Sequence, residues 1–245
     1  MSLGKLKQIF KTFRELRRLP RVTLNLELAK TEANHPFFRD LTDNFYRAVS
    51  QRHPKIPLIR RVEFGYAVCD LRTETRPYSQ RLDSAARRNL KKAMRLGFAF
   101  EEINYNDYLL DVTAIHHSAA IRQGRPMPKH ILTKPATGHS NPPSQTAFHD
   151  YPYFGILKSG TLVAYAGCFV AGELCELQTI YGHADFLPDG VVPLLIASIG
   201  DLLPTRYPDV RYFAYGTYYG ASETMKRFKR KFLFMPHRAS WKLGA

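Results

Sequence analysis

The sequence predicts an α/β (α+β) fold with a mixed, largely antiparallel central sheet that is flanked by helices. Residues 153–181 contain three strand-like runs joined by tight turns at 159–160 and 171–172, which is the pattern of an antiparallel meander. The almost wholly apolar segment 191–203 predicts a buried helix, and strand and helix patterns alternate after it. Runs of strands followed by alternating helices and strands indicate this fold class.

The composition is that of a globular protein. Hydrophobic residues make up 44% of the 245 residues and aromatic residues 13%, which is too much for a disordered chain. No run of 18 apolar residues could span a bilayer, and the N-terminus lacks the pattern of a signal peptide. The three cysteines, Cys69, Cys168 and Cys175, form no CxxC pair, so they support neither a disulfide framework nor a zinc site. We therefore expect a cytoplasmic protein.

The net charge of +15 is concentrated in three segments of the chain. Residues 1–22, 72–95 and 226–245 carry +6, +6 and +7, and the remainder is slightly acidic. This pattern favours a polyanionic partner, which could be tRNA, a phosphate-rich cofactor or an anionic lipid surface. Basic faces that only keep the protein soluble are the alternative.

Residues 1–60 are expected to form a basic N-terminal helix and cap, and residues 61–245 the main domain. Apolar residues recur at spacings of three and four from Leu3 to Leu16, and Pro20 ends this amphipathic pattern. Such a helix could dock on the body of the protein, bind a partner, or lie peripherally on an anionic membrane at its inner face.

In the first half of the chain, periodicity and end signals define the other elements. Strands are expected at 22–28, 62–71 and 98–103, and helices at 36–49, 79–96 and 108–121. Asp83 or Ser84 can cap the basic helix, and Gly97 can close it. The proline- and histidine-rich segment 122–152 is expected to be a long loop, either a functional lid or an inert insertion.

The second half adds strands at 153–157, 162–170, 174–181, 210–215 and 232–243, and helices at 191–203 and 222–231. The loop before the apolar helix is a candidate phosphate site, because a helix N-terminus presents unpaired N–H groups. We expect its backbone to bind a pyrophosphate through Asp185, Phe186, Leu187, Asp189, Gly190 and Val191. The alternative is an ordinary strand-to-helix connection in which Asp189 caps the helix.

This order of elements resembles the GNAT-like acyltransferase superfamily, and more narrowly the Fem-type aminoacyltransferases and related single-domain acyltransferases. Residues 84–97, SAARRNLKKAMRLG, are similar to the basic helix of those proteins, and residues 225–234, MKRFKRKFLF, to their closing FK-x-x-F-G-F element. Residues 157–199 follow the same order of strand, strand, loop and helix. The chain differs from the family at Leu233, where a glycine is usual, and at Ala214 and Tyr215, where an acidic residue is frequent.

The resemblance implies an acyl donor held between two central strands and an amine acceptor that loses a proton. It makes Lys229 the candidate cation near the reacting carbonyl, although Lys229 could be one more solvated lysine in a basic segment. The candidate proton carriers are Glu176, His183 and four tyrosines, Tyr181, Tyr215, Tyr218 and Tyr219. Their alternatives are a paired structural ion for Glu176, a surface hydrogen bond for His183 and aromatic packing for the tyrosines.

We therefore expect an N-acyltransferase that moves an acyl group from a phosphate-bearing donor, most simply acyl-CoA, to an amine. The alternatives are an aminoacyl-tRNA-dependent aminoacyltransferase and a non-catalytic RNA- or membrane-surface-binding protein with the same fold. No metal is expected, because His116 and His117 are adjacent and the histidines of the 122–152 loop lack a ligand spacing. The chain also lacks the common nucleotide-binding and serine-hydrolase motifs.

Overall fold

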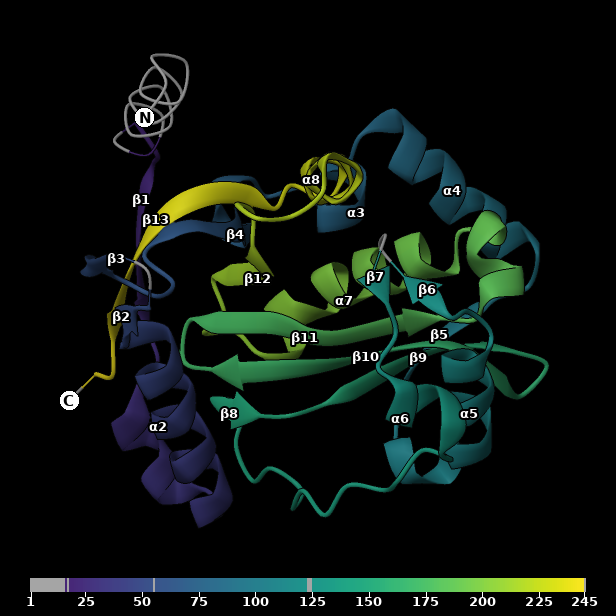
Figure 1. The fold of residues 1–245 in the computed structure, drawn as a ribbon, viewed down its shortest axis with the longest axis horizontal. Coiled ribbons are helices and arrows are strands. Elements are labelled where there is room, and N and C mark those ends of the chain that lie inside the picture. The colour runs from purple at the N-terminus through teal and green to yellow at the C-terminus, as the bar shows by residue number, and fades with distance from the viewer. Residues whose placement is uncertain (1–15, 17, 55, 123–124, 245) are drawn as a thin grey trace.

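The computed structural model of the protein describes residues 16, 18–54, 56–122 and 125–244. The amphipathic helix expected before Pro20 lies outside these residues almost entirely. The first element of the described chain is β1, a strand of the main sheet (Figure 1).

The core of the fold is a nine-stranded mixed sheet, which confirms the predicted fold class. Its order is β1-β13-β4-β12-β11-β10-β9-β5, with the short β8 paired to β10. The pairs β1–β13 and β11–β12 are parallel, and the others are antiparallel. The strands are β1 (Arg21–Asn25), β4 (Phe64–Asp70), β5 (Ala99–Ile103), β8 (His149–Asp150), β9 (Tyr153–Lys158), β10 (Thr161–Ala171), β11 (Leu174–Gly182), β12 (Tyr212–Thr217) and β13 (Met235–Lys242).

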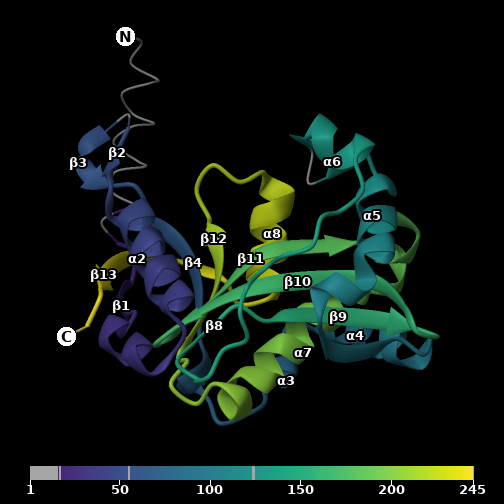
Figure 2. The ribbon, with the colours of Figure 1, turned by 90° about the horizontal axis from the view of Figure 1, so that it is seen from below.

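Helices cover both faces of this sheet. In Figures 1 and 2, α7 runs along one face with α3 and α4 beyond it, whereas α2 and α5 lie at the other face. The helices are α2 (Pro36–Ser50), α3 (Tyr78–Arg81), α4 (Ser84–Arg95), α5 (Leu109–His117), α6 (Lys129–Thr133), α7 (Val191–Arg206) and α8 (Glu223–Lys231). Two hairpins, β2 (Arg52–His53) with β3 (Ile56–Arg60) and β6 (Ile121–Arg122) with β7 (Arg125–Pro126), stand outside the main sheet.

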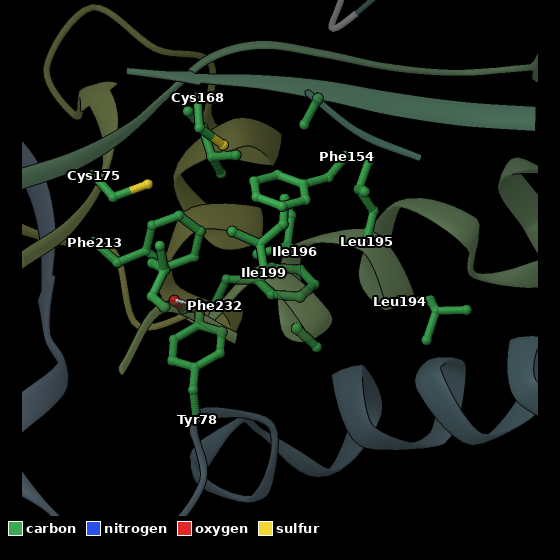
Figure 3. Packing of buried hydrophobic residues seen from close by; sticks show 14 of the residues in the cluster. Tyr78, Phe154, Cys168, Cys175, Leu194, Leu195, Ile196, Ile199, Phe213 and Phe232 are labelled. Atoms are coloured by element: carbon green, nitrogen blue, oxygen red, sulfur yellow. Dashed lines mark hydrogen bonds between the residues drawn. The ribbon is translucent and has the colours of Figure 1, made fainter. Parts of the chain in front are cut away.

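The largest core cluster lies between α7 and the sheet (Figure 3). Because α7 is apolar on nearly all sides, it buries Leu195, Ile196 and Ile199 completely. Burial of each such side chain contributes roughly 1.5–3 kcal/mol to the free energy of unfolding. On the other side of α7, the ring of Tyr78 lies against Gly200, and the Tyr78 hydroxyl donates to the Phe232 carbonyl oxygen at 2.6 Å.

The residues at the two ends of the basic helix α4 act as the sequence predicts. The Asp83 carboxylate accepts a hydrogen bond from the Ala86 N–H at 2.6 Å and so caps its start, as one of the two predicted residues should. Gly97 follows the helix with a φ of +79°, the left-handed conformation that glycine adopts without strain.

The structure differs from the sequence-based expectations in the 122–152 segment, at the end of α5 and at the start of β13. The segment 122–152 is only partly a loop, because it contains β7, α6 and β8, and the buried His149 ring lies 2.8 Å from the Leu26 carbonyl oxygen. The helix expected to reach residue 121 ends at His117, since Ile121 begins the β6–β7 hairpin. The last strand begins at Met235 rather than residue 232 because α8 and the turn after it occupy the intervening residues.

The first segment contributes to the same sheet as the rest of the chain. β1 pairs with β13, and Phe45 of α2 packs on Phe169 and Trp241 at ring-centroid distances of 4.5 and 5.6 Å. The division at residue 60 remains a prediction. Within the described residues, no helix is both long enough and apolar enough to cross a membrane.

Candidate functional site

The sheet opens between its two adjacent parallel strands, β11 and β12. These strands pair only at Leu174–Tyr212, Cys175–Phe213 and Glu176–Ala214, although β11 continues to Gly182 and β12 to Thr217. The pairing of β12 with β4 also shifts register between Ala214 and Thr217. The carboxyl-terminal ends of the two strands therefore leave backbone groups unpaired with each other, at a place where a ligand can lie between them.

A cavity of about 660 Å³ occupies this opening. It is bounded by the two strands, the turn after β12 and one side of α8, and its lining includes Glu176, Gln178, Tyr215, Tyr219, Met225 and Lys229. A second cavity, of about 610 Å³, shares Tyr215 and Met225 and extends between the end of β11 and the start of α7. A third, of about 290 Å³, shares Gln178 and Tyr215 and reaches the β6–β7 hairpin. The three cavities therefore adjoin along one cleft.

Glu176 is the acidic group in this cleft, and only 9% of its surface is exposed. Burial raises the pKa of its carboxyl to about 7, because a buried site disfavours the charged form. The Tyr66 hydroxyl, the Gln178 side chain, the Gly216 backbone N–H and the Lys229 ammonium act in the opposite direction and lower that pKa. The Tyr66 hydroxyl is itself buried and forms no hydrogen bond of regular geometry. Glu176 can thus gain or lose a proton near neutral pH.

Lys229 brings a positive charge to the same cavity. Its side chain is buried because α8 packs through Phe228 and Phe232, and burial lowers the pKa of the ammonium to about 8, although Glu176 raises it. The Nζ atom donates to the carbonyl oxygens of Tyr215 at 2.5 Å and Thr217 at 2.7 Å. Lys229 is therefore not a solvated surface lysine. It holds the irregular end of β12.

Tyr219 lines the same cavity and packs closely on the backbone of β4. A Cβ atom at Gly65, whose φ is +79°, would lie 2.1 Å from the Tyr219 ring, so this contact requires glycine. The structure thus brings together Glu176, Tyr219 and Lys229, three of the candidate catalytic residues.

His183, another candidate, does not line any of the three cavities. Its ring nitrogen Nδ1 accepts from the Asp185 N–H at 3.4 Å, and its backbone N–H donates to the Val163 carbonyl oxygen. His183 therefore caps the short 3₁₀ helix η4 (Ala184–Asp189).

The predicted phosphate loop is docked on α4. Asp189 forms an ion pair with Lys92 at 3.0 Å, and a Cβ atom at Gly190 would lie 2.5 Å from the Asn89 carbonyl oxygen. Of the other predicted residues, Leu187 lines the second cavity and Asp185 is exposed. The Phe186 ring packs on the Phe98 ring at a centroid distance of 5.8 Å, and Val191 is fully buried. Phosphate binding by this loop remains a prediction.

Two residues that the sequence did not indicate as site residues are Tyr66, which interacts with Glu176 from the buried side, and Arg122, which lines two of the cavities. Tyr66 reads as an ordinary strand residue, and Arg122 as the start of a loop. Neither belongs to a motif, because each is brought to its position by the tertiary packing of distant segments. In the described part of the chain, no three His, Cys, Asp or Glu side chains are grouped as a metal site would need, and the three cysteines are buried free thiols.

Comparison with known proteins supports the fold alone. The chain matches no family model and no curated protein. Among solved structures, FemX superposes with a TM-score of 0.52 at 9% identity, over 73% of this chain and 60% of FemX. This likeness confirms the GNAT-like fold expected from the resemblance. The chain therefore spans about three fifths of the length of FemX.

Two further similar structures have lower TM-scores. The C-terminal domain (DUF2156) of a protein assigned as lysylphosphatidylglycerol synthetase from Agrobacterium fabrum is 18% identical, with coverage of 71% of this chain and 57% of that one and a TM-score of 0.46. A tandem GNAT protein from the clavulanic acid biosynthesis pathway is 13% identical, with coverage of 71% and 50% and a TM-score of 0.45.

Proposed function

We propose that the protein is an N-acyltransferase that transfers an acyl group from a phosphate-bearing donor to an amine. The observation that carries this proposal is the cleft between β11 and β12, in which a buried carboxyl with a pKa of about 7 and a buried ammonium line one cavity. A fold likeness alone would not assign an activity. A carboxyl that is half ionised near neutral pH suits the removal of a proton from an amine.

In the proposed reaction, the donor thioester lies between the two strands with its carbonyl carbon near Glu176. The acceptor nitrogen forms the new C–N bond, and the Glu176 carboxylate takes the proton that this nitrogen loses. The C–S bond then breaks, and a proton passes from Tyr219 to the departing sulfur. The Lys229 charge favours the ionised form of Glu176 and stabilises negative charge that develops in this part of the cleft.

Coenzyme A is the donor carrier that we propose first. The second cavity extends from this centre past Ile180 and Gly182 to Val192 and Pro193 at the start of α7, which suits a long and narrow arm. The helix start and the nearby basic helices α4 and α8 suit the phosphates at the far end of such an arm. The predicted loop 185–191 keeps a role in this proposal as the neighbour of those phosphates.

The test is to incubate the full-length protein with acyl-CoA thioesters and a panel of primary amines. Turnover is measured as the release of the free thiol. Glu176→Gln should lower turnover about 100-fold or more, because the glutamine amide cannot accept the proton. Glu101→Gln, at an exposed glutamate of β5, is the matched control and should retain full turnover. Thiol release that is equal in the two variants would contradict the assignment of Glu176.

The aminoacyl-tRNA donor stays the second candidate, because one surface feature favours it. A groove of about 610 Å³ lies between α3 and α4 and is lined by Arg76, Arg87, Arg88 and Lys91. In the described chain, none of the last three has a carboxylate within 4 Å. Free cations of this kind bind phosphate backbones, with an affinity that falls steeply as salt rises.

Two assays separate the donors and the non-catalytic alternatives. Transfer of a labelled aminoacyl group from tRNA, with no transfer from acyl-CoA, would replace the CoA proposal. Binding of RNA or anionic vesicles without any turnover would favour a non-catalytic binding protein. The membrane-binding role of the N-terminal helix, which lies outside the described residues, and the cytoplasmic location remain predictions.

A further inference from the structure

Arg122 connects three parts of the fold at the edge of the cleft. Its Nη1 donates to the carbonyl oxygen of Gly182, the last residue of β11, at 2.8 Å. Its Nη2 donates to the Ile115 carbonyl oxygen and, at 3.1 Å, to the Ser118 hydroxyl oxygen. Each of these three acceptors is a neutral oxygen. The hydrogen bonds therefore orient the guanidinium without balancing its charge.

Among the described residues, Arg122 has only uncharged partners. Within the described residues, no carboxylate comes within 4 Å of the guanidinium. The guanidinium carbon lies 5.5 Å from the centre of the Tyr181 ring, and the Nε atom is buried without a hydrogen-bond partner. Burial lowers the pKa of Arg122, while Tyr181 and Tyr165 raise it. A partly buried cation with only neutral partners is unfavourable unless an anion approaches it.

The same side chain lines two of the adjoining cavities. It borders the second cavity, which leads from the start of α7, and the third cavity, whose lining also includes Pro126 and Met127. A guanidinium has five N–H donors, and the three bonds described above use three of them. The second Nη1 hydrogen and the charge therefore remain for a ligand in the cleft, whereas the Nε–H is buried.

We infer that Arg122 forms an anion subsite that binds a phosphate or carboxylate group of a substrate seated in this cleft. The planar guanidinium matches both groups, and hydrogen bonds to an ionised partner are about twice as strong as neutral ones. The inference rests on the proposed function, since it assigns the anion to a substrate of the transfer reaction. The anion belongs either to the donor, as a phosphate, or to the acceptor, as a carboxylate.

Binding measurements with the full-length protein distinguish these two sources. Coenzyme A and pantetheine form the donor pair, because pantetheine has the same arm without the phosphate groups. β-Alanine and propylamine form the acceptor pair, because only the first has a carboxylate. Each probe is titrated by calorimetry into the wild type, Arg122→Gln and Arg122→Lys. Arg227→Gln, at an exposed cation of α8, measures the general effect of losing one charge.

The expected result is a selective loss. Arg122→Gln should lower the affinity for the charged probe of one pair about 10-fold or more. It should change the affinity for the neutral probe of that pair less than 2-fold. Arg122→Lys should retain part of the affinity, and Arg227→Gln nearly all of it. A loss of affinity for coenzyme A shows that Arg122 binds a donor phosphate. A loss of affinity for β-alanine shows that it binds an acceptor carboxylate. Equal effects on charged and neutral probes, or no effect on any probe, would overturn the inference.

A second measurement guards against misfolding, because Arg122 also holds three backbone and side-chain oxygens in place. In the ¹⁵N-labelled wild type, the Nε–H resonance of Arg122 should shift when the charged probe is added and stay fixed with the neutral one. An unmoved resonance with bound charged probe would overturn the inference independently of any variant. If coenzyme A fails to bind the wild type, the donor proposal fails, and the β-alanine pair still decides whether Arg122 binds anions.

Discussion

The ammonium nitrogen of Lys229 lies 2.5 Å from the carbonyl oxygen of Tyr215, and it is also within 2.7 Å of the Thr217 carbonyl oxygen. The lysine of the FK element is thus a hydrogen-bond donor to the strand that ends at the cleft. It is also a charge that lowers the pKa of Glu176. One side chain therefore shapes the cleft and sets the electrostatics of its acid.

Lys229→Met should lose both stability and activity. The variant leaves the carbonyls of Tyr215 and Thr217 without their donor, so we expect a loss of about 2 kcal/mol in the free energy of unfolding. Loss of the charge should lower turnover about 100-fold. Urea denaturation and initial rates measure the two effects. Arg227→Met, at an exposed residue of the same helix, should change neither by much. A stable and active Lys229→Met variant would show that these bonds are dispensable.

The rate should depend on pH through Glu176. Because the carboxylate is the form that accepts a proton and the pKa is about 7, kcat/KM should rise as pH increases through 7. Loss of the Lys229 charge above pH 8 should bend the profile downward. The two groups interact, so the apparent values belong to the pair. A profile that is flat from pH 6 to 8 in the wild type would rule out Glu176 as the base.

Glu176 should also affect stability, with a definite sign. A carboxyl whose folded pKa is raised from 4.5 to about 7 binds its proton more tightly in the folded state, so stability falls as pH rises from about 4.5 to 7. Between pH 4 and pH 8 this loss amounts to about 3 kcal/mol. Glu176→Gln should remove it, and the variant should be more stable than the wild type at pH 8 but not at pH 4. Denaturation curves at both pH values check this difference.

The parts that sequence reasoning predicted are those determined by neighbouring residues. The Asp83 cap, the meander of β9 to β11 and the apolar α7 follow from local pattern. The contact between Tyr66 and Glu176 joins residues 110 positions apart, and no periodicity encodes it. The bonds from Lys229 to β12 depend equally on how α8 packs. The sequence therefore indicated the residue types of the cleft, whereas packing alone determines which of them meet.

Leu233 illustrates the same distinction at the level of the backbone. The sequence has leucine where glycine is usual in the resembling proteins, and the structure gives Leu233 a φ of +61°. The left-handed conformation is therefore present although the residue is unfavourable for it by roughly 1 kcal/mol. The surrounding packing of Phe232 and Phe234, both buried in the core, holds the turn in place.

The last prediction concerns Gly200, in the middle of α7. Alanine normally stabilises a helix interior by about 1 kcal/mol relative to glycine. Here a Cβ atom would lie 2.2 Å from the Tyr78 ring, which cannot move freely because its hydroxyl donates to Phe232. Gly200→Ala should therefore destabilise the protein by about 2 kcal/mol.

Two comparisons isolate the cause. Ser198→Ala, at a half-buried residue of the same helix, should leave the free energy of unfolding unchanged or slightly higher. Tyr78→Ala destabilises by itself, because it removes a buried ring, but in that background Gly200→Ala should no longer be unfavourable. A double-mutant cycle measured by chemical denaturation tests this coupling. If the effects of the two substitutions simply add, the ring is not the obstacle, and the close packing of α3 on α7 does not explain the glycine.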